Sequence, residues 1–116
     1  MGRLTTHVLD TARGQPAAGM TIELFSLHDG RTRLKTVTTN KDGRCDAPLL
    51  EGAALGAGRY ELVFAVGEYF RAAGVASSDP PFLDYVPIQF QVADPAAHYH
   101  VPLLVSPFGY TTYRGS

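Results

Sequence analysis

The sequence predicts an all-β fold, either a sandwich or a barrel. Residues 85–92 alternate between two faces, one of which is formed by Val86, Ile88, Phe90 and Val92. Clusters of Gly, Pro, Asn and Asp, the residues that favour turns, separate the candidate strands at short intervals. Many short strands joined by such turns are typical of sandwiches and barrels.

The remaining elements follow from residue type and spacing. Residues 59–66 alternate in the same way and predict a second strand with one apolar face. β-branched and aromatic residues predict weaker strands over residues 4–9, 21–27, 34–39, 99–105 and 110–113. Residues 67–74 predict a helix of about two turns, because good helix formers lie between glycines. Residues 75–82 are expected to form a loop.

Length and charge limit the class of protein. A chain of 116 residues has the size of one compact domain, so we expect residues 1–116 to form a single domain. Ten basic and eleven acidic residues nearly cancel and form no run, which argues against nucleic acid or a membrane surface as partner. The N-terminus lacks the apolar segment of a secretory signal, so we expect the cytoplasm.

Two histidines are candidates for chemistry. If the strand over residues 99–105 buries Tyr99 and Val101, then His98 and His100 both point away from the core. Solvated surface histidines are the ordinary explanation, and a zinc site is the alternative. Zinc is disfavoured because the chain has neither cysteine pairs nor a helical His-Glu-x-x-His motif, so we expect no metal and no cofactor. The single cysteine, Cys45, is expected to be structural.

Three further positions carry suitable functional groups. His7 has the strand parity that faces away from the core. Arg44 follows the turn of residues 40–43 and is either solvated or able to present its guanidinium to a planar anion or carbonyl. Residues 113–116 combine a phenol, a guanidinium, a glycine, a hydroxyl and a terminal carboxylate at a chain end, where a frayed tail is the ordinary expectation.

Three dispersed motifs resemble the 5-hydroxyisourate hydrolases, which are relatives of transthyretin. The motifs are LTTHVLD at residues 4–10, HYHVPLL at residues 98–104 and YRGS at residues 113–116. The last of these distinguishes the hydrolases from the hormone-carrying transthyretins. The resemblance implies a transthyretin-like two-sheet sandwich of about eight strands with one short helix. It also implies a homotetramer, a dimer of dimers with the substrate sites at the subunit interface.

The resemblance further implies a reaction and its residues. The reaction is the metal-free hydrolysis of 5-hydroxyisourate to 2-oxo-4-hydroxy-4-carboxy-5-ureidoimidazoline in urate catabolism. The catalytic set corresponds to His7, Arg44, His100 and Ser116. The substrate-binding set comprises His7, Arg44, His98, Tyr113, Arg114, Gly115 and Ser116.

These side chains suit the hydrolysis of a cyclic acyl–nitrogen bond, which needs a base near neutral pH and stabilisation of an oxyanion. We expect His7 and His100 to orient and deprotonate the water, with one of them later protonating the leaving nitrogen; which is the base stays open. Arg44 would hold the anionic substrate and stabilise the developing charge. Arg114 and Ser116 would position the purine and help to bind the water or the oxyanion.

Two other functions stay open at this point. A transthyretin-type carrier would bind a small planar ligand without chemistry, although the motif at residues 113–116 argues against it. A generic β-sandwich adhesion or carbohydrate-binding module is also possible, because a fold does not dictate a function. That interpretation leaves the histidine and arginine positions unexplained.

Overall fold

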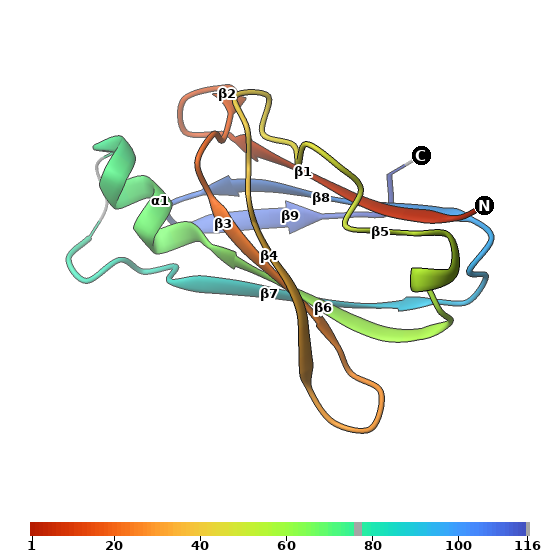
Figure 1. Cartoon of the computed structure of the whole chain (residues 1–116). Helices are drawn as coiled ribbons and strands as arrows, with labels where there is room; N and C mark the ends of the chain where they lie inside the picture. Colours follow the sequence, from red (N-terminus) through yellow and green to blue (C-terminus); the bar gives the residue numbers. More distant parts are fainter. Residues whose placement is uncertain (76–77, 116) are drawn as a thin grey trace.

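A computed structural model describes residues 1–75 and 78–115 and shows two β-sheets packed face to face (Figure 1). The first sheet has the order β2-β1-β8-β9, with β5 pairing to β1. Its strands are β1 (Arg3–Asp10), β2 (Gln15–Pro16), β5 (Leu50–Glu51), β8 (His98–Ser106) and β9 (Gly109–Thr112). The second sheet has the order β4-β3-β6-β7, formed by β3 (Thr21–Ser26), β4 (Thr32–Thr38), β6 (Gly58–Ala65) and β7 (Tyr85–Val92).

The predicted sandwich with one short α-helix is confirmed, and each predicted strand or helix end lies within two residues of the observed end. The two-residue strands β2 and β5 and the 3-10 helix Gly52–Ala54 were not predicted, because segments of two or three residues carry no periodic pattern. The loop expected over residues 75–82 includes residues 76–77, which lie outside the described residues. None of the described helices is long and apolar enough to cross a membrane.

The pairing of β1 with β8 positions the outer face of the first sheet. The two strands run parallel, with Thr5 opposite His100 and His7 opposite Pro102. Alternate residues of both strands, such as Leu4 on β1, are buried in the core shared with the second sheet. The intervening residues therefore lie side by side on the outer face.

The apolar face predicted for β6 is confirmed, since Tyr60, Leu62 and Phe64 lie in the core, but the opposite face of the strand is also largely buried. Glu61, on the face opposite the core, is only 6% exposed. Arg31 covers it from the β3–β4 hairpin, with Nε donating to Glu61 Oε1 at 2.9 Å, and Gln89 Nε2 donates to Oε2 at 3.2 Å. The Arg31 guanidinium also lies 3.6 Å from the centroid of the Phe25 ring. Long polar side chains thus bury a strand face that alternation alone assigns to solvent.

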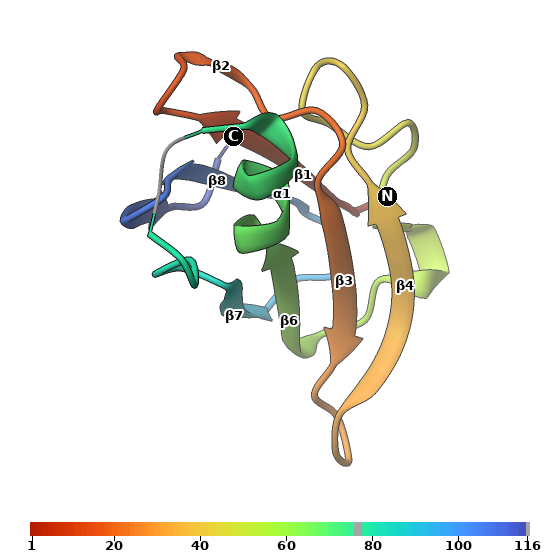
Figure 2. The ribbon, with the colours of Figure 1, turned by 90° about the vertical axis from the view of Figure 1, so that its left-hand side faces the viewer.

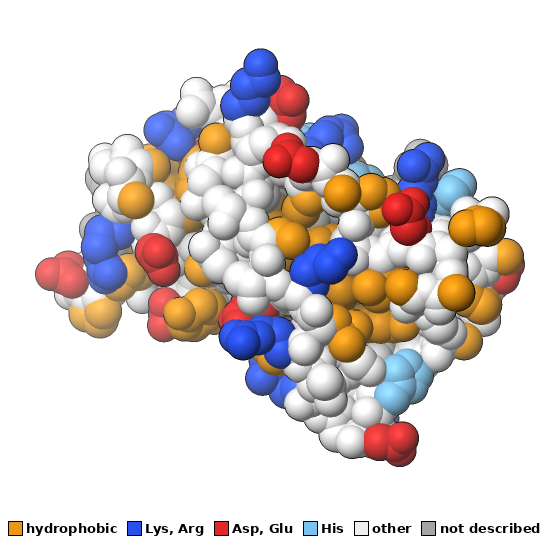
Figure 3. All heavy atoms as spheres, viewed as in Figure 1, with side chains coloured by type: hydrophobic (Ala, Val, Ile, Leu, Met, Phe, Trp, Pro, Cys, Tyr) orange, Lys and Arg blue, Asp and Glu red, His pale blue; other side chains and the backbone are white. Residues whose placement is uncertain are grey.

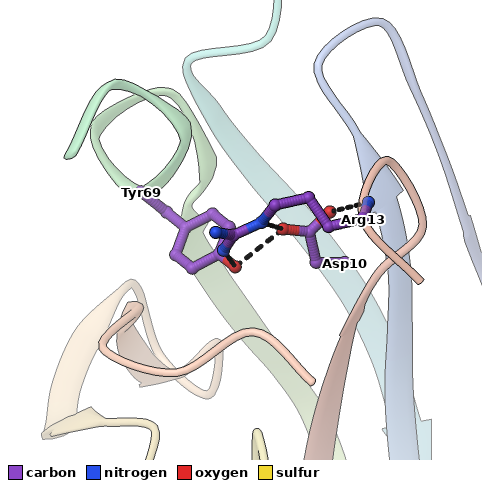
Figure 4. Close-up of polar contacts among 3 residues, drawn as sticks. All are labelled: Asp10, Arg13 and Tyr69. Atoms are coloured by element: carbon purple, nitrogen blue, oxygen red, sulfur yellow. Dashed lines mark hydrogen bonds and ion pairs between the residues drawn. The ribbon is translucent and has the colours of Figure 1, made fainter. Parts of the chain in front are cut away.

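Helix α1 (Val66–Ala73) lies at one end of the sandwich (Figure 2). A polar cluster connects it to the end of β1 (Figure 4). The fully buried Asp10 accepts hydrogen bonds at Oδ2 from Arg13 Nε (2.9 Å) and the Tyr69 hydroxyl (2.8 Å). Arg13 Nη2 also donates to the Tyr69 hydroxyl at 2.7 Å. Burial opposes ionisation of Asp10, yet the hydrogen bonds from Arg13 and Tyr69 outweigh it and lower the pKa of Asp10.

We expect Tyr69→Phe to lower the free energy of unfolding by about 1–3 kcal/mol, because it removes a hydrogen bond to a buried carboxylate. Urea unfolding measures the difference, with Thr36→Val as the control because it removes an exposed hydroxyl on β4. The stability that Asp10 contributes is fully present above the unfolded carboxyl pKa of about 3.9 and is lost as pH falls through the lower folded-state pKa. The difference in free energy of unfolding between the wild type and Tyr69→Phe should therefore become smaller in acid. A difference that does not change with pH would contradict this account.

Candidate active site

An open cleft of about 510 Å³ lies on the outer face of the first sheet. It is lined by Arg3, Thr5, His7, Arg44, His98, His100, Tyr113 and Gly115. Figure 3 shows pale-blue His and blue Lys or Arg side chains adjoining one another at the upper right of the molecule, on the side where the C-terminus lies in Figure 1. The volume is within the range of small-molecule sites, roughly 300–1,000 Å³.

The three histidines predicted as site residues share this cleft. His7 projects from β1 and His100 from β8, each half-buried on the outer face, and His98 is exposed two residues before His100. The outward orientation predicted from strand alternation is therefore confirmed. The rings of His7 and His100 are stacked with their centroids 6.5 Å apart and 26° between their planes. One small molecule can contact both imidazoles.

The turn before Arg44 is held closed by the side chain of Asn40. Its Oδ1 accepts hydrogen bonds from the backbone N–H groups of Asp42 (2.9 Å) and Arg44 (3.2 Å). The backbone N–H of Asn40 in turn donates to the carbonyl of Arg44 at 2.7 Å. Asn is common in turns because its side chain can make these local bonds.

Gly43 then fastens this turn to β1. It has a φ of +72°, and a Cβ at this position would lie 2.4 Å from the carbonyl oxygen of Val8, so only glycine fits. The Gly43 carbonyl accepts a hydrogen bond from the Val8 N–H at 2.8 Å. Arg44 consequently forms an antiparallel bridge with His7, which brings the two predicted site residues together.

The C-terminal segment returns across β8 to the cleft. The N–H of Gly115 donates to the carbonyl of His100 at 2.7 Å. A Cβ on Gly115 would lie 2.6 Å from Cδ2 of His100, so glycine allows the backbone to pack directly on the imidazole. Tyr113 lines the cleft and is 56% exposed. Ser116, predicted as a catalytic and binding residue, lies outside the described residues.

Arg114 is the predicted site residue that lies away from the cleft lining. Its guanidinium carbon is 4.1 Å from the centroid of the Tyr99 ring, and Nη2 donates to the carbonyl of His98 at 3.1 Å. It borders a separate depression that also contacts β7. In this chain Arg114 anchors the C-terminal segment to β8 through a cation–π contact and a hydrogen bond.

Charges and burial act on both half-buried histidines. Burial lowers the pKa of His7, the Arg44 guanidinium lowers it further, and a hydrogen bond with the backbone of Asp42 opposes the shift. Burial also lowers the pKa of His100, followed by the effects of Arg44 and His7. Because the ordinary value is about 6.5, both imidazoles are mainly neutral at pH 7 and can accept a proton.

Two cleft residues, Arg3 and Thr5, were missed in the sequence. They share the strand parity of His7 on β1, so extending the outward face of that strand to its start would have found them. Burial raises the pKa of the Cys45 thiol, which agrees with a structural role. Within residues 1–75 and 78–115, no three His, Cys, Asp or Glu side chains cluster as a metal site requires.

Fold and cleft together define a class: a transthyretin-like β-sandwich that carries a polar site of histidine and arginine on the outer face of one sheet. The chain belongs to the HIUase/Transthyretin family, whose model matches residues 4–115. The family resemblance read from the three sequence motifs is therefore confirmed.

Individual relatives support the family assignment. The chain is 66% identical over 117 residues to the 5-hydroxyisourate hydrolase of Ralstonia nicotianae, covering all of both chains. Its structure resembles that of (S)-allantoin synthase with a TM-score of 0.95 at 46% identity, over 99% of this chain but only 44% of that one. It also resembles sea bream transthyretin in complex with thyroxine, with a TM-score of 0.86 at 28% identity over 97% of this chain and 94% of that one.

We expect Arg44→Gln to raise the pKa of both His7 and His100 toward 6.5, because it removes a cation that disfavours the imidazolium. NMR titration of the histidine ring protons measures both values. Arg59→Gln removes the same charge from an exposed position on the other sheet and should leave them unchanged. Histidine pKa values equal to those of the wild type in Arg44→Gln would disprove the electrostatic link.

Proposed function

We propose that residues 1–116 form a hydrolase domain that converts 5-hydroxyisourate to 2-oxo-4-hydroxy-4-carboxy-5-ureidoimidazoline in urate catabolism. One observation carries the proposal. The cleft joins two imidazoles of lowered pKa, His7 and His100, to the Arg44 turn and the C-terminal segment, in a chain 66% identical to a 5-hydroxyisourate hydrolase. The cytoplasmic location stays a prediction.

The proposed mechanism uses water activated by histidine. The water oxygen attacks the acyl carbon of the ring while its proton passes to a neutral imidazole, either His7 or His100. The tetrahedral oxyanion then collapses with cleavage of the carbon–nitrogen bond, and the leaving nitrogen takes a proton from an imidazolium. Because both rings face the same cleft with lowered pKa values, they suit the base and the acid roles in succession.

The other residues bind the substrate and stabilise charge. We assign Arg44 to the anionic ring of the substrate and to the oxyanion, since a guanidinium presents several donors in one plane. His98, Tyr113 and Gly115 would complete the cleft wall. The roles predicted for Arg114 and Ser116 in positioning the purine and the water stay predictions.

We further propose that the enzyme is a homotetramer, a dimer of dimers, with each cleft closed by a neighbouring subunit. Strands β7 and β9 lie at the edges of their sheets in the described part of the chain. Exposed aromatic side chains follow these edges and the segments beside them: Phe82, Tyr85, Phe108 and Tyr110. Unpaired edges and exposed apolar groups favour association. Exclusion of water by a facing subunit would strengthen the electrostatic interactions on which the mechanism depends.

The alternative is a carrier of a small planar ligand, which the resemblance to thyroxine-bound sea bream transthyretin favours. The cleft of this chain, however, presents histidine and arginine side chains to the ligand. Such a lining suits a polar anion better than a hydrophobic ligand.

We expect the purified protein to accelerate the ultraviolet absorbance decay of freshly generated 5-hydroxyisourate. His100→Ala should lower kcat by about 100-fold or more, the usual contribution of a general base. His28→Ala is the matched control, because His28 lies in the β3–β4 connection of the other sheet and contacts Tyr60. Both variants should retain the wild-type oligomeric state in sedimentation.

The same assay includes a chelator arm. Acceleration should persist after chelator treatment, and its loss would indicate a metal in place of the histidine mechanism. An assembled protein that gives no acceleration would refute the hydrolase and leave the carrier as the better account.

Assembly is tested by Phe82→Glu, which places a charge on an aromatic side chain that is 68% exposed in the isolated chain. We expect this variant to dissociate in sedimentation velocity and to lose activity in parallel, because the cleft would open to water. Leu34→Glu, which changes an exposed apolar residue of β4, is the control and should remain assembled. A fully active monomer would overturn the proposal that the site needs a second subunit.

A further inference from the structure

We propose that Thr5 is a positioning residue for His100: its hydroxyl accepts a hydrogen bond from Nδ1–H and leaves Nε2 directed into the cleft as the proton acceptor. The inference rests on the proposed function and deepens it, since it assigns the base to His100. Its starting observation is the distance of 2.8 Å between Thr5 Oγ1 and His100 Nδ1.

The strand register creates this contact. Thr5 on β1 pairs directly with His100 on the parallel strand β8, and both side chains lie on the outer face. A Cβ on Gly115 would lie within 3.3 Å of Cβ, Cγ and Cδ2 of His100, so the Gly115 backbone lies close to the same side chain. A directly paired strand residue and a close backbone contact therefore restrict rotation of the imidazole, as a positioned catalytic group requires.

The Thr5 hydroxyl can stabilise His100 after proton transfer. When His100 takes a proton from water at Nε2, the imidazolium has N–H groups on both ring nitrogens. Nδ1 must then donate, and Thr5 Oγ1 lies at hydrogen-bond distance to accept. A bond to the charged form stabilises the product of proton transfer and hence the transition state that leads to it.

A neutral partner also suits the surrounding charges. His7 from β1 and Arg44 from the turn act on His100, and Arg3 and His98 line the same cleft. No carboxylate side chain is among the described residues that line it. A carboxylate at Nδ1 would raise the pKa of the imidazole and increase its protonated fraction near neutral pH, whereas a hydroxyl orients the ring without adding a charge.

The test compares Thr5→Val, which has nearly the same shape but no hydroxyl, with Thr5→Ser, which keeps it. We expect Thr5→Val to lower kcat about 10-fold, the effect of losing one hydrogen bond to a charged group, with KM changed by less than about 2-fold. The acidic limb of the kcat profile should move to lower pH, because the imidazolium loses its acceptor. Thr5→Ser should restore both the rate and the profile.

Thr6→Val is the matched structural control. Thr6 is the next residue on β1, but its hydroxyl donates to the Val101 carbonyl in the core at 2.7 Å. This variant should lower stability and leave the pH profile unchanged. Equal rate losses in Thr5→Val and Thr5→Ser, or the same shift of the profile in Thr6→Val, would overturn the proposal.

A second measurement does not depend on turnover. ¹⁵N NMR of the ligand-free protein should show the Nδ1–H tautomer of His100 in the wild type and in Thr5→Ser, and a tautomer mixture in Thr5→Val. A wild-type Nε2–H tautomer would overturn the inference even if the enzyme is active. Absence of hydrolysis together with the expected tautomer would refute the proposed function while preserving the structural contact.

Discussion

The candidate site depends on the parallel register of β1 and β8. Leu4 and Val8 of β1 face the core together with Tyr99 and Val101 of β8, and this burial fixes which side of each strand points outward. A shift of one strand by a single residue would turn its core side chains to solvent and its cleft side chains inward. Hydrophobic burial on one face of the sheet therefore determines the polar constellation on the other.

The two segments that complete the cleft attach to these same strands through backbone hydrogen bonds. The turn before Arg44 bonds to β1 through Gly43, and the C-terminal segment bonds to β8 through Gly115. A Cβ at Gly43 would clash with the Val8 carbonyl of β1, and a Cβ at Gly115 would clash with the His100 side chain, so glycine permits the close approach in both places. Groups far apart in the chain thus meet on one rigid support, which limits the reorganisation needed when a substrate binds.

Strand positions and the orientation of the histidines could be predicted because alternation is a local property of the sequence. The burial of Glu61 and the position of Arg114 over Tyr99 could not, because each depends on a partner from a distant segment. Strand parity alone could have placed Thr5 on the cleft face, but its contact with His100 depends on the register of β1 with β8, which no single strand reveals. Three motifs in one order identified the family, but the contacts among their residues required the folded chain.

The two faces of β1 place their polar groups in different surroundings. Asp10 is enclosed on the core side with Arg13 and Tyr69, whereas the cleft side presents His7 near the guanidinium of Arg44. A carboxylate on the cleft side would raise the histidine pKa and occupy the guanidinium. Closure by a second subunit would remove more water and lower the histidine pKa further. An anionic substrate in the cleft would instead raise the histidine pKa. A neutral base and a cationic anchor can therefore coexist near neutral pH, because the described lining of the cleft includes no carboxylate side chain.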